Sequence, residues 1–291
     1  MSSGQRFRDL VASTKPLQIV GTINAYTALQ AEQQKHQAIY LSGAGVANAS
    51  FGIPDLGITM MNDVLEDARR ITAVSHMPLL VDIDTGWGNA LCISRVIKEI
   101  TRAGVAAVHI EDQVVQKRCG HRPNKKLVSC DEMVDRIKAA VDARSDESFV
   151  IMARTDAIAS EGLNAALDRM QRYREAGADM MFPEAVASLE DFAIICSDLS
   201  VPVLANITEF GQTPLFNCRM LADSGVSMVL YPLSAFRAMS KAAENVYACI
   251  FSEGSQSNVV STMQSREDLY KCLDYHAYER AMDNILKHSS S

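Results

Sequence analysis

The sequence lacks several features that define common classes of protein. No apolar run approaches the ~20 residues that a membrane-spanning helix needs, and the polar segment Met1–Leu10 contains no signal-peptide core. There is no basic tail, and a formal net charge of −7 offers no positive face to a nucleic acid. The 7 cysteines are odd in number and irregularly spaced, unlike a disulfide framework or a zinc-ligand array. We therefore expect a cytoplasmic protein without membrane or nucleic-acid partners.

The composition is that of a globular protein with a sizeable core. Hydrophobic residues make up 48% of the chain and charged residues 22%, which is average for a soluble domain. The length of 291 residues permits two domains, but it is also ordinary for a single α/β barrel.

After a short polar helix, one unit repeats along the chain: an apolar run follows Pro or Gly and leads into a helical pattern. Eight candidate strands result: Leu17–Thr22, Ala38–Ser42, Leu79–Asp82, Ala107–Glu111, Phe149–Arg154, Met180–Phe182, Val203–Asn206 and Met228–Tyr231. Strands that alternate with helices predict right-handed crossovers and a parallel sheet. Eight such units predict a closed (β/α)8 TIM-type barrel. A doubly wound open sheet is the alternative, although no Gly-x-Gly-x-x-Gly follows the first strand.

The C-terminal region holds more helical pattern than one closing unit of a barrel requires. We predict one barrel domain over residues 1–291, with residues 235–288 as a helical extension. The surplus apolar faces of this extension can pack against a partner subunit or within the chain, and the pattern does not decide between them.

A short cationic segment, Lys117–Lys126, is the most distinctive stretch. It gathers 6 basic side chains around Cys119 in an otherwise acidic chain. Neighbouring cations lower the pKa of a thiol and prepare it for nucleophilic or proton-transfer work. His121 can tune Cys119 or bind a substrate, and Gly120 lets the backbone approach a ligand. The segment predicts a loop that grips a polyanion and presents sulfur to it, while a solvated basic turn with an incidental cysteine is equally compatible.

Paired carboxylates end the third predicted strand. Because side chains alternate along a strand, Asp82 and Asp84 should project to the same side. Two adjacent carboxylates repel each other unless one is protonated or a cation lies between them. Their oxygens favour Mg²⁺ or Mn²⁺ over zinc, whereas capping or turn aspartates are the alternative. Further acids at or just past strand ends favour the metal: Asp55, Glu111, Asp112 and Glu184.

Basic and polar groups are predicted at the same edge. Arg154 ends the fifth strand and Arg237 follows the eighth. A guanidinium matches a carboxylate in two parallel hydrogen bonds. The run Tyr40–Gly45 supplies a hydroxyl and backbone N–H groups that can cradle an anion, and Asn206 and Thr208 follow the seventh strand. In a barrel these groups share the C-terminal face, and together they suit a small di- or tricarboxylate.

The run Lys117–His121 resembles the signature of the isocitrate lyase/phosphoenolpyruvate mutase superfamily, in its lyase branch. The extension Arg122–Lys125 is similar to members that cleave 2-methylisocitrate. The likeness covers nearly the whole chain, with one departure: Ala44 stands where a third glycine is expected. Further matching runs are Tyr40–Gly45, Phe51–Asp55, Val81–Gly88, His109–Gln113, Met152–Asp156, Phe182–Ala185, Leu204–Pro214 and Tyr231–Met239.

The resemblance implies a Mg²⁺-dependent carbon–carbon lyase of propionate catabolism, in the methylcitrate cycle. It would cleave (2S,3R)-2-methylisocitrate to pyruvate and succinate by a retro-aldol step, as a homotetramer that exchanges C-terminal helices. Cys119 would be the general acid, Tyr40 or Glu111 the base, and His121 a further catalytic candidate. The implied metal site is Asp82, Asp84 and Asp55. The implied substrate ligands are Ser42, Gly43, Ala44, Cys119, Gly120, Arg154, Glu184, Asn206, Ile207, Thr208, Arg237 and Arg266.

Three other functions remain open from the residues alone. Isocitrate is the nearest alternative substrate, but isocitrate lyases are longer and carry a Ser-Pro-Ser type run where this chain reads Asn206–Gly211. A phosphonopyruvate mutase or an oxaloacetate-hydrolysing enzyme has no need of the Cys-Gly-His loop. A non-catalytic, redox-sensing binder that uses Cys119 belongs to a different class.

Overall fold

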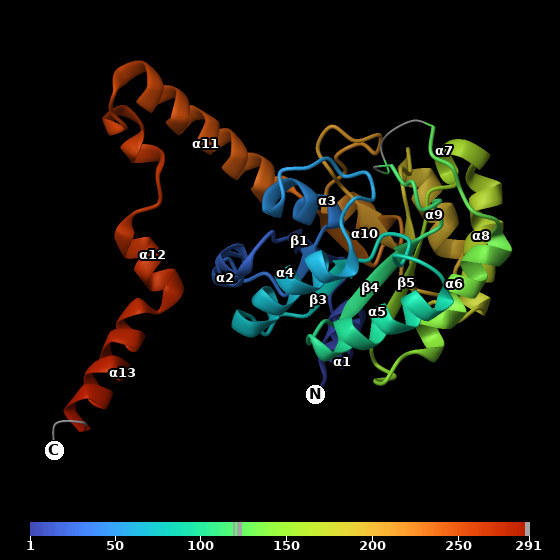
Figure 1. Ribbon diagram of the computed structural model, residues 1–291. Helices are drawn as coiled ribbons and strands as arrows, with labels where there is room; N and C mark the ends of the chain where they lie inside the picture. The colour runs from blue at the N-terminus through green and yellow to red at the C-terminus, as the bar shows by residue number, and fades with distance from the viewer. Residues whose placement is uncertain (119, 121–123, 289–291) are drawn as a thin grey trace. The chain divides into compact units, whose positions relative to one another are not determined.

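The structure is a computed structural model that describes residues 1–118, 120 and 124–288. The chain divides into two compact units, Met1–Phe236 and Arg237–Ser291, and each is described here by itself. The predicted strand pattern lies entirely in the first unit (Figure 1).

The first unit is a barrel of parallel strands. The sheet order is β6-β5-β4-β3-β2-β1-β8-β7, with every neighbouring pair parallel. A parallel bridge between Met181 and Val203 links the two end strands. The predicted (β/α)8 barrel is therefore confirmed. The strands are β1 Leu17–Gly21, β2 Ala38–Leu41, β3 Leu79–Asp82, β4 Ala107–Glu111, β5 Val150–Thr155, β6 Met180–Pro183, β7 Leu204–Asn206 and β8 Met228–Tyr231.

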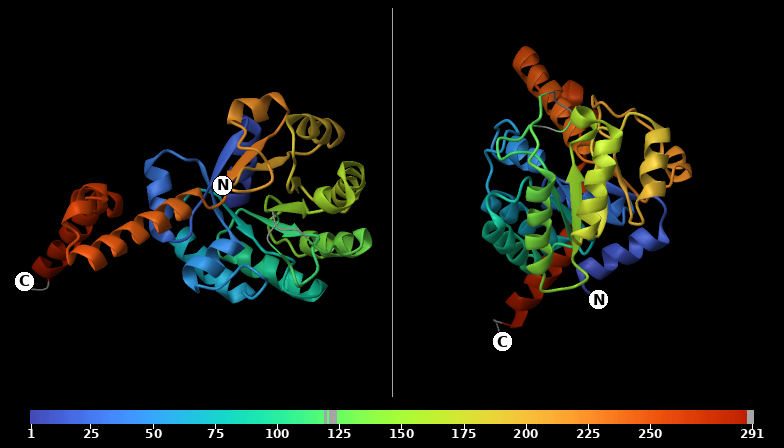
Figure 2. Two further views of the ribbon diagram at one scale, coloured as in Figure 1. Left: turned by 90° about the horizontal axis from the view of Figure 1, so that it is seen from above. Right: turned by 90° about the vertical axis from the view of Figure 1, so that its right-hand side faces the viewer.

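Helices cover the outside of these strands (Figure 2). Those of the first unit are α1 Ser3–Ser13, α2 Ala25–Gln33, α3 Gly43–Gly45, α4 Met61–Val74, α5 Ala90–Arg102, α6 Cys130–Asp142, α7 Ile158–Glu161, α8 Leu163–Glu175, α9 Leu189–Asp198 and α10 Cys218–Asp223. In α5 the buried residues Ile93, Val96, Ile97 and Ile100 recur at helical spacing, and Asn89 caps the first turn. Such faces bury the outer surface of the barrel against its helices.

The N-terminal helix α1 packs against the interior of the barrel. Its Phe7 and Val11 are buried in one cluster with residues at the beginnings of strands, such as Leu17, Val150 and Met228. The sequence indicates only a short polar helix here, but in the structure its two apolar residues cover the N-terminal end of the barrel. The opposite end is left for the loops that follow the strands, which lie at the top of Figure 1.

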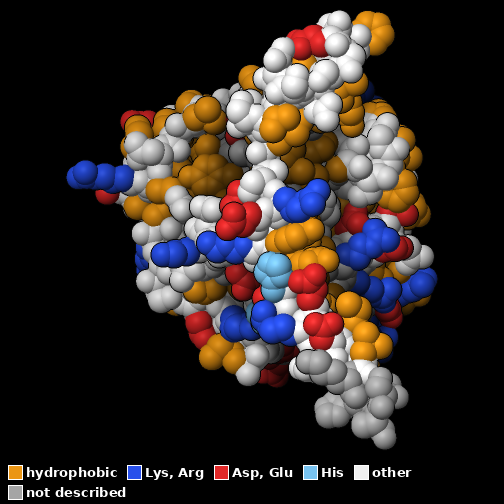
Figure 3. Space-filling model, turned by 90° about the vertical axis from the view of Figure 1, so that its left-hand side faces the viewer, with side chains coloured by type: hydrophobic (Ala, Val, Ile, Leu, Met, Phe, Trp, Pro, Cys, Tyr) orange, Lys and Arg blue, Asp and Glu red, His pale blue; other side chains and the backbone are white. Residues whose placement is uncertain are grey.

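The second unit is helical. It contains most of α11 (Ser234–Glu253), a 3₁₀ turn at Ser257–Thr262, α12 (Arg266–Leu273) and α13 (Tyr275–His288). Several large apolar side chains are exposed there, including Phe251 at 93% and Tyr278 at 75%. Figure 3 shows apolar side chains on the surface between charged ones. None of the helices in the described part of the chain is long and apolar enough to cross a membrane.

Candidate active site

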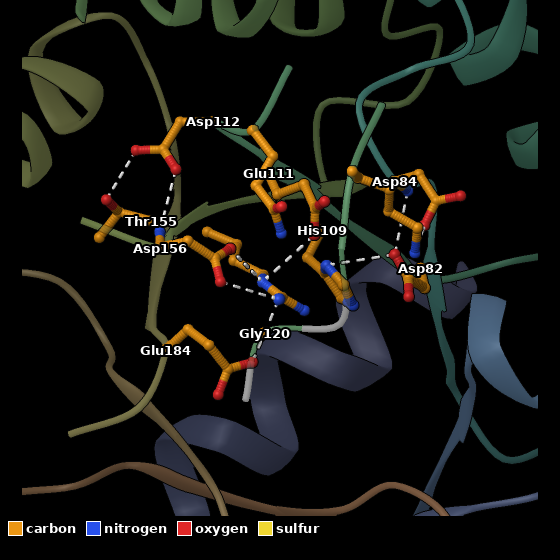
Figure 4. Close-up of polar contacts among 12 residues, drawn as sticks. Asp82, Asp84, His109, Glu111, Asp112, Gly120, Thr155, Asp156 and Glu184 are labelled. Carbon is orange, nitrogen blue, oxygen red and sulfur yellow. Dashed lines mark hydrogen bonds and ion pairs between the residues drawn. The ribbon is translucent and has the colours of Figure 1, made fainter. Parts of the chain in front are cut away.

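The strand register places charged side chains next to each other at the C-terminal end of the barrel. Asp82 of β3 pairs in register with His109 of β4, and Glu111 of β4 pairs with Arg154 of β5. All four side chains are buried. The close-up in Figure 4 shows Asp82, His109 and Glu111 together with Glu184, which follows β6, and Gly120. Two groups of charges result, one on each side of β4.

The first group, here called the aspartate cluster, consists of Asp55, Asp82, Asp84 and Lys117. Strand β3 ends at Asp82, so Asp84 is not placed by strand alternation as the sequence predicts. Asp84 instead adopts a left-handed conformation with φ of 48°, which aspartate tolerates better than most residues. Its N–H donates to Asp82 Oδ1 at 3.0 Å. The two carboxylates still come together, through a tight turn rather than through the strand.

Gly43 shows how closely these two carboxylates approach each other. A Cβ atom at this position would lie 3.1 Å from Asp82 Oδ2 and 3.1 Å from Asp84 Oδ1. The Gly43 N–H donates to Asp82 Oδ2 at 3.1 Å. The predicted backbone donor of the Ser42–Gly45 run therefore contacts a site carboxylate, and Ser42 itself is buried beside it. Ala44, also predicted as a ligand, lies within the short helix α3.

Lys117 is a buried cation in this cluster, with only 5% of its surface exposed. Its Nζ contacts Asp84 and lies 2.7 Å from Asp55 Oδ1. Burial alone would lower the pKa of Lys117, but the surrounding carboxylates raise it well above its usual value. Burial and the neighbouring Asp82 raise the pKa of Asp84 to about 7 despite the ammonium. One ammonium is therefore shared among three carboxylates, which leaves the cluster short of positive charge.

The aspartate cluster fits a hard divalent cation. Mg²⁺ in proteins takes one or two carboxylates and keeps several waters, and Asp82 and Asp84 offer two converging carboxylates. Among the described residues, no group of three or more His, Cys, Asp or Glu side chains is arranged to hold a metal. Water and substrate oxygens would therefore supply the other ligands. Asp55, predicted as a third metal residue, is paired with Lys117.

The second group, here called the arginine cluster, consists of Arg154, Asp156, Glu184 and Glu111. Asp156 and Arg154 form a bidentate pair: Arg154 Nε donates a hydrogen bond to Asp156 Oδ2 at 3.0 Å, and Arg154 Nη2 donates one to Asp156 Oδ1 at 3.2 Å. Arg154 Nη2 also lies 3.2 Å from Glu184 Oε2, and Nε lies 3.4 Å from Glu111 Oε2. Burial would lower the pKa of Arg154, but these carboxylates raise it well above its usual value. The guanidinium is thus permanently charged and fixed in direction.

Gly120 brings the cationic loop into contact with this cluster. A Cβ atom on Gly120 would lie 2.5 Å from Arg154 Nη2 and 2.6 Å from Glu184 Oε2. Only a residue without a side chain permits this approach. Cys119 and His121, the predicted acid and its neighbour, lie outside the described residues.

Between the two clusters lies a buried pair of rings. The hydroxyl of Tyr40 lies 2.9 Å from His109 Nε2, and His109 Nδ1 lies 3.7 Å from Asp82 Oδ1. His109 Nδ1 has no hydrogen-bond partner among the described residues. Burial lowers the pKa of His109 to about 4, so the ring is neutral at neutral pH. Burial, followed by Asp82, raises the pKa of Tyr40 well above its usual value.

Glu111 is the other candidate base. Burial raises the pKa of its carboxyl well above the usual range, although Arg154 opposes the shift. Its Oε1 accepts no hydrogen bond within the described part of the chain. A buried carboxyl group with one unengaged oxygen can hold or receive a proton, so both candidates stay open.

The remaining predicted ligands divide between the two units. Asn206 Nδ2 lies 3.3 Å from both carboxylate oxygens of Glu184, which adds the end of β7 to the arginine cluster. Ile207 and Thr208 follow it and are buried. Arg237 and Arg266 belong to the second unit and are exposed there. Their predicted role at the substrate stays a prediction.

The sequence counts Asp112 among the acids that favour a metal, but in the structure Asp112 supports Asp156 instead. Asp112 is fully buried and accepts hydrogen bonds from Thr155 Oγ1 at 2.7 Å, the Asp156 N–H at 2.9 Å and Tyr173 OH at 2.9 Å. Asp156 is held by this network and in turn holds Arg154. The spacing Arg154-Thr155-Asp156 was the available signal, since a carboxylate two residues from a strand-end arginine can pair with it.

Fold and site together define an α/β-barrel enzyme with two clusters of buried charged side chains at one end of the barrel. The family model for phosphoenolpyruvate phosphomutase matches residues 7–251, so the chain belongs to this family. A 2-methylisocitrate lyase from Shewanella oneidensis is 62% identical over 284 residues, covering 98% of this chain and 97% of that protein.

Solved structures agree with the fold. A 2,3-dimethylmalate lyase, described as a PEP mutase/isocitrate lyase superfamily member, superposes with a TM-score of 0.90 at 31% identity, covering 97% of this chain and 96% of that one. A phosphonopyruvate hydrolase in complex with oxalate and Mg²⁺ superposes with a TM-score of 0.87 at 29% identity, covering 98% and 100%. The superfamily resemblance predicted from the sequence is confirmed.

Proposed function

We propose that this chain is a Mg²⁺-dependent lyase that cleaves 2-methylisocitrate to pyruvate and succinate in propionate catabolism. The observation that carries the proposal is full-length similarity to a 2-methylisocitrate lyase at 62% identity. The geometry supports it, because one end of the barrel offers a cluster short of positive charge beside a fixed guanidinium. A tricarboxylate with a hydroxyl group suits both halves.

The reaction begins with loss of the proton from the C2 hydroxyl of the substrate. The electron pair of the O–H bond forms the C2=O carbonyl of pyruvate while the C2–C3 bond breaks. The electron pair of the C2–C3 bond stays with C3 and delocalises onto the oxygens of the carboxylate attached to C3. That fragment is the aci-carboxylate of succinate, and it takes a proton on carbon from the thiol of Cys119. The first proton goes either to Glu111 in its carboxylate form or to Tyr40, which would pass its own hydroxyl proton to His109 Nε2 at 2.9 Å. Protons and electrons therefore balance without an oxidant or reductant.

Asp82 and Asp84 would hold Mg²⁺, with Mn²⁺ as a possible substitute. The ion supplies positive charge where the hydroxyl and carboxylate oxygens of the pyruvate half become more negative. A magnesium ion accompanies oxalate in the related phosphonopyruvate hydrolase structure. Lys117 partly neutralises the same carboxylates and lies in position to limit their repulsion.

The arginine cluster would hold the succinate half. Arg154 presents donors whose direction is fixed by Asp156, and a fixed fork loses little freedom when it binds a carboxylate. Gly120 lies beside it and offers a backbone N–H, and Asn206 offers an amide from β7. Thr208, Glu184, Arg237 and Arg266 complete the proposed set of ligands.

Assembly and location extend the proposal. The exposed Phe251 and Tyr278 support a homotetramer in which the C-terminal helices of one subunit pack on another. In this account residues 235–288 form an extension of a single barrel domain, and the enzyme works in the cytoplasm. Sedimentation analysis tests the assembly, and a monomer at micromolar concentration would exclude it.

Steady-state kinetics test the substrate. We expect kcat/KM for 2-methylisocitrate to exceed that for isocitrate by at least tenfold, because a pocket that accommodates a methyl group typically discriminates by about 1–3 kcal/mol. A preference for isocitrate, or release of no pyruvate, would overturn the proposed function.

A further inference from the structure

Lys125 is a buried cation that the proposed mechanism leaves without a role. Only 3% of its side chain is exposed. Its Nζ donates to Asp156 Oδ1 at 2.7 Å and also to the carbonyl oxygen of Gly120. One ammonium therefore connects the cationic loop to a carboxylate at the end of β5, 31 residues further along the chain.

Both groups that Lys125 contacts are parts of the candidate active site. Asp156 Oδ1, which accepts from Lys125, also accepts from Arg154 Nη2 at 3.2 Å. The same carboxylate therefore lies between an ammonium and a guanidinium. Burial would raise the pKa of Asp156, but Arg154 and Lys125 outweigh burial and lower it. A charged carboxylate held between two cations fixes both of them strongly.

The contact of Gly120 with the arginine cluster depends on the exact position of the Gly120 backbone. The backbone of Gly120 passes so close to Arg154 and Glu184 that a Cβ atom would overlap both. A shift of the Gly120 peptide by a few tenths of an ångström therefore changes its contact with the guanidinium.

We propose that Lys125 is a positioning residue: it binds the Gly120 carbonyl and Asp156 together, and so sets the loop that bears the thiol against the arginine that binds the succinate half. This inference rests on the proposed function. Lys125 touches neither the substrate nor the reacting atoms in this account. Its effect reaches the reaction through Gly120 on one side and through Asp156 and Arg154 on the other.

The neighbouring lysine provides a matched control. Lys126 belongs to the same loop and carries the same charge, but it is exposed. Lys125→Met and Lys126→Met remove one positive charge each from adjacent positions. Any loss caused only by the weaker electrostatic attraction of the loop for an anionic substrate should therefore appear in both variants.

The experiment measures kcat and KM for 2-methylisocitrate in the Mg²⁺-loaded wild type, Lys125→Met and Lys126→Met, together with the rate of Cys119 alkylation with and without succinate. We expect Lys125→Met to lower kcat about 100-fold, since misplacing a reacting group by about 1 Å has effects of this size. We expect Lys126→Met to stay within threefold of the wild type. Succinate should slow alkylation of Cys119 in the wild type and in Lys126→Met, but not in Lys125→Met.

A merely structural role would give a different pattern. Lys125→Met would then lose activity only in proportion to the fraction of unfolded protein, and succinate would still protect Cys119. That result, or equal kcat values in the two variants, would overturn the proposal. If Lys125→Met does not fold, Lys125→Arg is compared with Lys126→Arg. The proposal expects reduced kcat only in Lys125→Arg, because a larger planar guanidinium does not reproduce the two contacts that one ammonium makes with Asp156 and Gly120. Equal kcat values in this pair would likewise overturn it. If the wild type itself releases no pyruvate, the proposed function fails instead.

Discussion

The two charged clusters at the end of the barrel differ in how their buried carboxylates are neutralised by cations. In the arginine cluster, carboxylates alternate with cations: Asp156 lies between Arg154 and Lys125, and Arg154 reaches Glu184 beyond it. In the aspartate cluster, Asp82 and Asp84 converge on each other beside Gly43, and Lys117 is the cation nearest to them. With Lys125 counted, the arginine cluster has two cations for three carboxylates, whereas the aspartate cluster has one cation for three carboxylates and gains from a further cation.

This difference supports the distinct tasks that we propose for the two clusters. A guanidinium whose carboxylate partners fix its direction is a prepared site for an anion, because little reorganisation accompanies binding. Converging carboxylates are a prepared site for a metal ion, because like charges at close range are stabilised by a cation between them. A substrate with several carboxylates can bind to both at once, directly on one side and through the metal on the other.

Metal removal is the strongest way to separate the two halves. We expect EDTA to abolish turnover and added Mg²⁺ to restore it, since only the aspartate cluster depends on the ion. Succinate should still bind to the metal-free protein through the arginine cluster, which calorimetry measures. Turnover that persists without metal would remove Asp82 and Asp84 from the mechanism.

Replacement of the Cys119 thiol should stop the reaction without weakening the binding of products to either cluster. We expect Cys119→Ser to lower kcat by about 1,000-fold, because a general acid contributes roughly 10²- to 10⁴-fold and a hydroxyl is a poor acid at this position. Product binding, measured by calorimetry, should remain within a few-fold of the wild type. Cys92→Ser is the control, because Cys92 is an exposed cysteine on α5. Unchanged turnover in Cys119→Ser would support a redox-sensing role instead.

A conservative change in the arginine cluster should weaken only that half. Arg154→Lys keeps the charge but loses the bidentate pair with Asp156, and we expect kcat/KM to fall about 100-fold. The affinity for Mg²⁺ should be nearly unchanged, which metal titration measures. Arg144→Lys is a matched control, because Arg144 pairs with Asp179 away from the site at 2.9 Å. A comparable loss of Mg²⁺ affinity in Arg154→Lys would show that the two halves are not separate.

The smallest change concerns Gly120. We expect Gly120→Ala to raise KM about tenfold or more, since the added methyl group would overlap Arg154 and Glu184 and overpacking costs about 1–3 kcal/mol. The melting temperature should change little because the loop contributes little to the barrel core. A KM equal to that of the wild type would indicate that the loop lies elsewhere during turnover.

The barrel was predictable because its signals are local and repeated. Apolar runs, six of the eight shortly after Pro or Gly, predict all the strands to within one residue, as at Phe149, which lies just before β5. The role of α1 was not predictable, because two apolar residues in a short polar helix do not reveal what they cover. Packing against distant strand beginnings is a property of the closed barrel rather than of the segment.

The site was predictable where its residues end strands, and less so elsewhere. Arg154 and Glu184 lie together because parallel strands bring their ends to one edge. The pairing of Asp82 with Asp84 follows from a left-handed turn at Asp84, for which strand alternation was the wrong reason. The contact between Lys125 and Asp156 was missed because it joins segments 31 residues apart, whereas the Arg154–Asp156 pair had a local signal in the spacing of the two residues. The catalytic and ligand roles of all these residues stay predictions.

The most direct test of the account is a crystal structure of the enzyme with Mg²⁺, pyruvate and succinate bound. We expect the metal at Asp82 and Asp84 with oxygens of pyruvate, and succinate at Arg154, with the Cys119 sulfur beside the succinate carbon that carried the broken bond. Both products bound on the same side of β4, or a sulfur remote from that carbon, would contradict it.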